Sequence, residues 1–197
     1  MQLKKGQLPI VLTAIIALII FTPLFLIRGN YEFLIYIGVM VFLTIVILAT
    51  NKRVNYPNSV LWALTVWAII HICGGGIYIG GKKLYEFMIF NIVGDPYNIF
   101  RYDQFAHIYG FFAATLAMYY LLKPILKKGL KKWTAVSVVV IMAGLGLGAL
   151  NEIIEFTATV FLAETGVGGY VNTCLDLVSN LIGAIIAMIF IYFKENK

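Results

Sequence analysis

Residues 133–159 have the sequence WTAVSVVVIMAGLGLGALNEIIEFTAT, and this stretch decides the fold. It carries no charged residue before Glu152. A helix that crosses a bilayer needs about 20 mostly apolar residues. The apolar run is continuous rather than alternating, which is typical of a membrane helix and not of a membrane β-barrel strand. The stretch therefore predicts a spanning helix, long enough to tilt or to begin in the interface.

The rest of the chain repeats this pattern. Of its 197 residues, 61% are hydrophobic and 12% charged, and the mean hydropathy is +0.92. A soluble domain carries about 25% charged residues, so the composition argues against one, and it excludes a disordered chain, a collagen-like chain and a disulfide-framework mini-protein. Five further apolar stretches lie at residues 8–27, 31–50, 58–73, 104–122 and 171–193, of which the third can extend to residue 79.

We therefore expect an all-α, polytopic, six-helix transmembrane bundle that forms one domain over residues 1–197. The first stretch is too long for the apolar region of a signal peptide, and no small-residue cleavage site follows it, so it is expected to remain as the first helix. Gly144 and Gly148 form a GxxxG motif, and Gly183 is followed by Ala184 and Ala187, which indicates close packing of the fifth and sixth helices.

The distribution of Lys and Arg predicts the orientation. These residues gather at both termini and in the second and fourth loops, namely Lys4, Lys5, Lys52, Arg53, Lys123, Lys127, Lys128, Lys131, Lys132, Lys194 and Lys197. Arg28, Lys82, Lys83 and Arg101 lie on the other side. By the positive-inside rule both termini are cytoplasmic, in the inner or cytoplasmic membrane of the cell. The asymmetry explains the net charge of +6 without nucleic acid, and membrane lipids are the expected partners.

The third loop, residues 74–103, is too long for a simple connector. Its apolar stretch, residues 84–93, is too short to span and precedes a Gly94-Asp95-Pro96 turn. We expect a helix in the interface or a re-entrant segment.

Cys73 and Cys174 match no metal-binding spacing and are expected to be small packing residues. A disulfide bridge between them is the alternative, because both fall near the same membrane face.

An ionisable or polar side chain inside a membrane-spanning helix costs free energy, so such residues indicate a functional site. They are Asp103 and His107 in the fourth helix, Asn151, Glu152 and Glu155 in the fifth, Thr173, Asp176 and Asn180 in the sixth, and His71 near the end of the third. Several pairs have i, i+4 or i, i+3 spacing, which places them on one helix face. At 1.5 Å per residue, all lie within roughly 15 Å of the outer boundary. The sequence thus predicts an outward-facing carboxylate and histidine pocket.

Repulsion among four carboxylates must be relieved by protonation, by external water or by a divalent cation. Oxygen and imidazole ligands suit Zn, Mn, Fe or Mg. Each residue also has a structural interpretation. Asp103 can cap its helix, His71 and His107 can be packing histidines, and Glu155 can reach headgroup water. Asp176 and Asn180 can simply join helices by hydrogen bonds.

The order of these motifs resembles the YjdF-like inner-membrane proteins, a family of unknown function, over about residues 62–193. The motifs are Trp67, His71, Gly74 and Gly75, then Tyr102, Asp103 and His107, then Glu152, Glu155 and Phe156, then Asp176, Asn180 and Gly183. More distantly, the order is similar to VanZ-like proteins, in which the second acid is usually Gln where this chain has Glu155. The resemblance implies one shared site and supplies no reaction.

The leading hypothesis is a metal-dependent hydrolase or transferase that acts on a lipid or envelope substrate. Asp103, His107, Glu152 and Asp176 would hold the metal, and the pocket would include Asn151, Asn180 and Thr173. Glu155 would be the general base, with His71 as a further ligand or proton shuttle. Alternatives are a proton- or cation-coupled transporter, for which a homo-oligomer could supply the missing inverted repeat, and a non-catalytic membrane scaffold. No substrate is indicated.

Overall fold

The computed structural model describes residues 3–126 and 133–196, so Lys127, Lys128, Lys131, Lys132 and Lys197 lie outside the described residues. Six helices are long and apolar enough to cross a membrane, which confirms the predicted all-α polytopic bundle. They are α1 (Leu8–Ile27), α2 (Tyr31–Val54), α3 (Asn58–Gly76), α4 (Tyr102–Leu122), α5 (Trp133–Phe161) and α6 (Tyr170–Glu195). A short 3-10 helix, η2 (Lys123–Ile125), follows α4.

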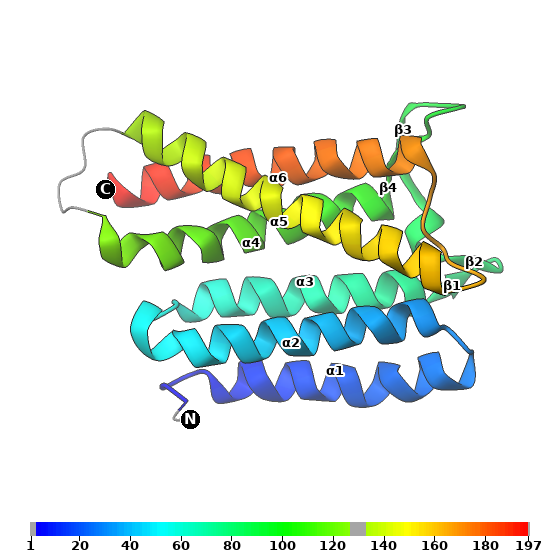
Figure 1. The fold of residues 1–197 in the computed structure, drawn as a ribbon, viewed down its shortest axis with the longest axis horizontal. Coiled ribbons are helices and arrows are strands. Elements are labelled where there is room, and N and C mark those ends of the chain that lie inside the picture. The colour runs from blue at the N-terminus through cyan, green and yellow to red at the C-terminus, as the bar shows by residue number, and fades with distance from the viewer. Residues whose placement is uncertain (1–2, 127–132, 197) are drawn as a thin grey trace.

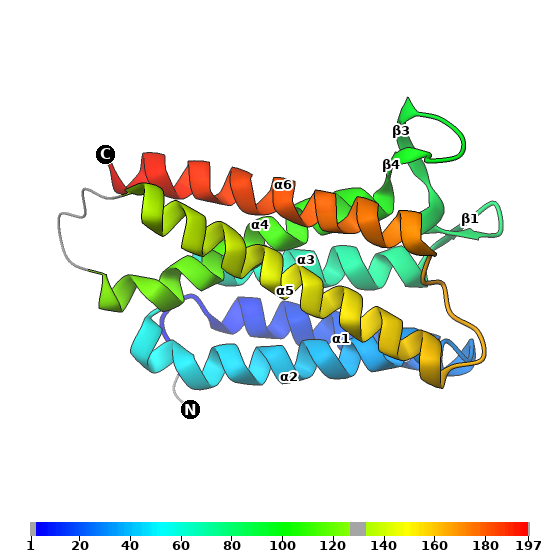
Figure 2. The same ribbon diagram turned by 45° about the horizontal axis from the view of Figure 1, so that its top comes forward.

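The helices form two groups of three. α1, α2 and α3 lie side by side in one group, and α4, α5 and α6 form the other, with α5 crossing the group obliquely (Figures 1 and 2). α3 packs against α4 and joins the groups. α1 begins and α6 ends at the same end of the bundle, which we call the terminal end (Figure 1).

Small residues of α5 and α6 allow close helix packing, as the sequence predicted, and the structure shows that α4 is part of this packing. A Cβ atom at Gly183 of α6 would overlap the carbonyl oxygen of Ile108 and would lie 2.9 Å from the backbone nitrogen of Phe112. A Cβ atom at Gly148 of α5 would lie 2.6 Å from Asn180 Nδ2. Ala184 has no exposed surface. These contacts bring the polar side chains of three helices within reach of one another.

Two β-hairpins project from the opposite end, which we call the hairpin end (Figure 1). β1 (Tyr78–Ile79) pairs with β2 (Lys82–Lys83), a 3-10 turn η1 (Leu84–Glu86) follows, and β3 (Met88–Val93) pairs antiparallel with β4 (Ile99–Arg101). The expectation of an interfacial helix or re-entrant segment at residues 84–93 is therefore wrong. The stretch is rich in β-branched and aromatic residues and runs into a Pro-containing turn, which favours a hairpin.

The second hairpin fixes the start of α4. β4 leads directly into the helix, and the backbone N–H of Tyr102 donates to the carbonyl oxygen of Phe87 over 2.8 Å. Asp103 is thereby held at the hairpin end. A buried aromatic cluster of Phe25, Phe33 and Tyr36 packs against Tyr85 of η1. Cys73 and Cys174 are partly buried free thiols.

Candidate metal centre

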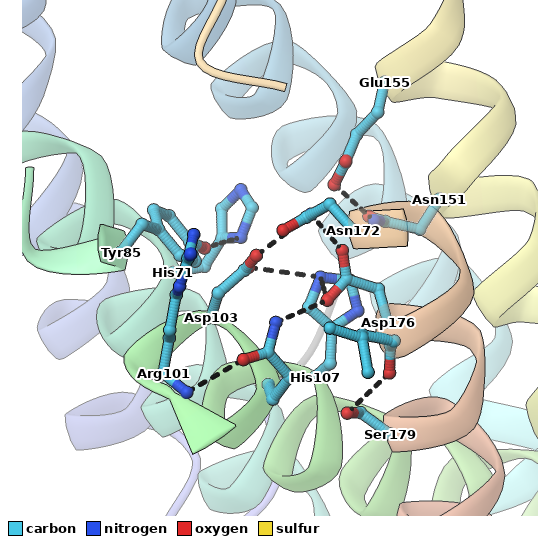
Figure 3. A network of polar contacts seen from close by, with 12 residues as sticks. His71, Tyr85, Arg101, Asp103, His107, Asn151, Glu155, Asn172, Asp176 and Ser179 are labelled. Atoms are coloured by element: carbon cyan, nitrogen blue, oxygen red, sulfur yellow. Dashed lines mark hydrogen bonds and ion pairs between the residues drawn. The ribbon is translucent and has the colours of Figure 1, made fainter. Parts of the chain in front are cut away.

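His107 lies between the charged side chains of α4 and α6. It is buried, and its Nδ1 is 2.9 Å from Asn180 Oδ1. An amide oxygen can only accept, so Nδ1 carries the hydrogen and donates it. The other ring nitrogen, Nε2, faces two carboxylate oxygens, Asp103 Oδ1 at 3.6 Å and Asp176 Oδ1 at 3.9 Å. The imidazole therefore presents Nε2 to two acids at once (Figure 3).

Amide side chains hold the two aspartates in place. Asp176 has no exposed surface, and its Oδ1 accepts from Gln104 Nε2 over 3.3 Å. Asn172 Nδ2 lies 2.5 Å from Asp176 Oδ2 and 3.2 Å from Asp103 Oδ2, and so bridges the two carboxylates (Figure 3). These donors orient the oxygens without neutralising their charge.

α5 contributes two more acids to the same place. Glu152 is buried, and its Oε1 lies 3.9 Å from His107 Nδ1. That oxygen has no hydrogen-bond partner among the residues that the structure describes. Glu155 Oε1 accepts from Asn151 Nδ2 over 2.8 Å. A buried polar atom without a hydrogen-bond partner costs free energy. A proton or a cation bound to Glu152 Oε1 would remove that cost.

The charge balance of these acids is unusual. Within the described ranges, no Lys or Arg side chain forms an ion pair with any of its four carboxylates. Two sets of side chains can each offer one ligand atom, with all ligand atoms of a set within 4.8 Å of one another. The first is Asp103, His107 and Asp176, and the second is His107, Glu152 and Glu155. We call the five residues together the His107 cluster.

His71 lies beside the cluster in α3 and belongs to neither set. Its Nδ1 is 2.5 Å from the hydroxyl oxygen of Tyr85 in η1. Burial and the nearby negative charge of Asp103 raise the pKa of Tyr85 well above its usual value. The phenol therefore stays protonated and donates to His71 Nδ1. His71, His107 and Asn151 line a cavity of about 10 Å³, which is roughly the room that one water molecule needs.

Membership of a family follows from comparison with known proteins. The chain matches the family described as "Predicted membrane protein (DUF2238)" over residues 8–197. It belongs to that family. DUF2238 is the family of the YjdF-like proteins, so the expected resemblance is confirmed, while the VanZ-like link receives no support. Neither a search of curated proteins nor one of solved structures found a match. The family description states a membrane location, which agrees with a multi-pass protein.

The sequence identified most of the residues that this DUF2238 protein brings together. Thr173 is an exception: its side chain makes no hydrogen bond to the cluster in the described structure, and its neighbour Asn172 takes that place. Gln104 and Tyr85 were also missed. The i, i+4 spacing of Asn172 and Asp176 was a usable signal, whereas nothing in the sequence linked Tyr85 to His71.

A second group of buried polar contacts lies near the hairpin end, around Glu32 of α2. Glu32 is 5% exposed. Its Oε2 accepts from the backbone N–H of Gly166 over 2.6 Å and lies 3.5 Å from Lys83 Nζ. Its Oε1 accepts from the Tyr36 hydroxyl over 3.2 Å. We call these residues the Glu32 group; it joins α2, the first hairpin and the segment between α5 and α6.

Proposed function

We propose that the His107 cluster binds a divalent metal ion, and that the protein uses the ion for hydrolysis or group transfer on a lipid or envelope-associated substrate. The observation that carries the proposal is the position of His107 Nε2, which faces Asp103 and Asp176 while Nδ1 donates to Asn180. A neutral imidazole with its hydrogen on Nδ1 directs its Nε2 lone pair at two anions. A cation between them removes that conflict.

The distances support an ion between these groups. A direct N–H···O hydrogen bond needs about 2.7–3.2 Å, and 3.6 and 3.9 Å are longer. Two ligands at about 2.1 Å from a tetrahedrally coordinated ion are about 3.4 Å apart, which is close to the observed values. Histidines that bind metals also donate their second N–H to a carbonyl or carboxylate, as His107 does to Asn180. One imidazole with several carboxylates suits Zn, Mn, Fe or Mg.

The chemistry follows from the remaining acids. Asp103, Asp176 and Nε2 of His107 would hold the ion, and Glu152, whose Oε1 now lies 3.9 Å from Nδ1 at the other edge of the ring, would turn toward the ion as a fourth ligand. A divalent ion in this place would supply activation of a water molecule. Glu155, paired with Asn151, offers an oxygen within 4.8 Å of the ligand atoms of His107 and Glu152 and would act as the general base. In a hydrolysis Glu155 would take the proton of the attacking water and return it to the leaving oxygen, so that the carboxylate is regenerated.

Access to the cluster is from the hairpin end. The Asp103 side chain is 17% exposed, whereas Asp176 is fully buried. If both termini are cytoplasmic, this end faces outward, and Asp103 marks the edge of the site that an outer-leaflet or envelope-associated substrate would meet. The inner or cytoplasmic membrane of the cell is the location that this orientation implies.

The direct test is turnover in liposomes. Purified protein is stripped with chelator, reloaded with Mn²⁺, Zn²⁺ or Mg²⁺, and assayed for phosphate release from short-chain phosphatidic acid and for choline release from short-chain phosphatidylcholine. We expect metal-dependent turnover that Glu155→Gln lowers by about 10²–10⁴-fold at unchanged metal content. Glu164→Gln, in the loop after α5, is the matched control. No turnover of either lipid by metal-loaded protein would reject the lipid hydrolase.

A cation carrier is the second candidate, because the cavity beside the cluster has room for about one water molecule and none for an organic substrate. Mn²⁺ entry into the same liposomes, followed with an entrapped fluorescent chelator, separates the two functions. The enzyme proposal predicts no protein-dependent entry. Entry that Asp176→Asn abolishes would favour the carrier.

A further inference from the structure

A groove lies at the terminal end of the bundle, far from the His107 cluster. It has a volume of about 150 Å³. α4 forms its floor through Phe112, Leu116, Tyr119 and Tyr120, and α3 and α6 form its sides through Ser59, Val60, Ala63, Phe190, Ile191, Lys194 and Glu195. Ser59 and Ala63 are small and lie one helical turn apart, so they leave the space that the groove occupies.

The groove is apolar along its length and positively charged at one end. Phe112 to Tyr120 spans about 12 Å of helix, without a charged residue. At the end of α6, Lys194 Nζ lies 3.1 Å from the Tyr120 hydroxyl and 5.9 Å from the centre of the Phe190 ring. Lys194 lies next to the last residue of α6, so the ammonium marks the end of the groove toward the terminal end.

The charge of Lys194 is not balanced within the described part of the chain. Lys123 pairs with Glu195 over 2.5 Å, which neutralises the neighbouring acid. Lys194 pairs with no carboxylate among residues 3–126 and 133–196. An apolar groove that ends at an ammonium with no carboxylate partner in the described ranges matches a molecule with a long apolar chain and an anionic head.

We infer that this groove binds one anionic phospholipid, with an acyl chain along α4 and the phosphate at Lys194. A peptide helix is about 10 Å wide and does not fit a volume of about 150 Å³. The predicted orientation places the terminal end at the cytoplasmic leaflet, where anionic lipids gather and attract Lys and Arg. This inference does not depend on the function proposed for the His107 cluster.

Native mass spectrometry of the detergent-purified full chain tests the inference. Phosphatidylglycerol and phosphatidylcholine with identical acyl chains are titrated separately. We expect one phosphatidylglycerol to be retained more tightly than phosphatidylcholine. Lys194→Gln should weaken the retention of phosphatidylglycerol about five-fold, the effect of one lysine near a membrane surface. Lys52→Gln, an exposed basic residue at the same end, is the matched control and should change nothing.

A second variant tests the apolar part. Ala63→Leu fills the groove between α3 and α4 and should abolish retention of either lipid, whereas Ala135→Leu, at an exposed position of α5, should retain both. Equal retention of the two lipids, or equal loss in Lys194→Gln and Lys52→Gln, would overturn the inference. So would undiminished retention by a folded Ala63→Leu protein. If Ala63→Leu does not fold, the comparison of Lys194→Gln with Lys52→Gln tests the inference by itself.

Discussion

The Glu32 group and the His107 cluster both bury acids near the hairpin end, but among the described residues only the Glu32 group has a Lys or Arg partner. Glu32 meets Lys83, a backbone N–H and a tyrosine hydroxyl, which together satisfy its charge and its hydrogen bonds. The carboxylates around His107 meet amides and an imidazole, and Glu152 Oε1 meets no donor in the described structure. A buried charge is stable only when it is paired. The first group is complete by itself, and the second needs a proton or an ion.

The largest expected effect comes from breaking the complete group. Lys83→Met leaves Glu32 buried without its cation and should lower the free energy of unfolding by about 3 kcal/mol. Unfolding in mixed micelles measures it. Lys82→Met, at the exposed neighbouring position, is the control and should cost under about 0.5 kcal/mol. Equal losses in the two variants would mean that Glu32 does not depend on Lys83.

Metal should stabilise only the incomplete cluster. A divalent ion at 100 times its dissociation constant should raise the free energy of unfolding by about 2.7 kcal/mol. The increase should vanish in Asp176→Asn and persist in Lys83→Met, because only Asp176 lies in the proposed site. Stabilisation of the Asp176→Asn protein as large as that of the wild type would place the ion elsewhere.

A smaller effect is expected at the edge of the cluster. Tyr85→Phe removes the donor to His71 Nδ1 and should cost about 1 kcal/mol of stability, the worth of one hydrogen bond. The metal content should not change, because His71 belongs to neither set of ligands. Tyr97→Phe, in the exposed turn of the second hairpin, is the control for the change in stability caused by loss of a tyrosine hydroxyl. Metal loss in Tyr85→Phe would make His71 part of the site.

The smallest effect of all is expected for Asp176 without metal, and the same change of acid to amide at Glu32 provides the contrast. In chelator, Asp176→Asn removes an uncompensated charge and keeps a similar shape, so the free energy of unfolding should stay within about 1 kcal/mol of the wild type or rise. Glu32→Gln should lower it by about 1–2 kcal/mol, because Gln accepts more weakly from Gly166 and leaves Lys83 unpaired. The same unfolding assay compares them. A larger loss in Asp176→Asn than in Glu32→Gln would reverse the comparison.

The sequence predicted the elements that depend on local composition. The six helices follow from apolar runs, and Gly183 and Gly148 were correctly assigned to close helix packing. Residues 84–93 were assigned wrongly because a short apolar run has the same appearance in a helix and in a strand, and only its pairing with Ile99–Arg101 decides.

The sequence predicted those residues of the candidate site whose side chains cost free energy inside a membrane. Asp103, His107, Glu152 and Asp176 stood out for that reason alone, and the structure brings them together. Asn172 and Gln104 are ordinary near a helix end and became significant only once α4 and α6 were packed. The ion pair between Lys83 and Glu32 forms only because the first hairpin folds next to α2, and no local sequence pattern predicts that contact.

Elemental analysis of the detergent-purified protein, prepared without chelator, tests the metal centre most directly. Wild type, Asp176→Ala, Glu152→Ala and Lys83→Met are compared, each shown to be folded by its circular dichroism. We predict about one equivalent of a divalent metal in the wild type and in Lys83→Met, and its loss in Asp176→Ala and Glu152→Ala. Equal metal content in all four proteins, or none in the wild type after dialysis against Zn²⁺, Mn²⁺, Fe²⁺ and Mg²⁺, would contradict a metal ion in the His107 cluster.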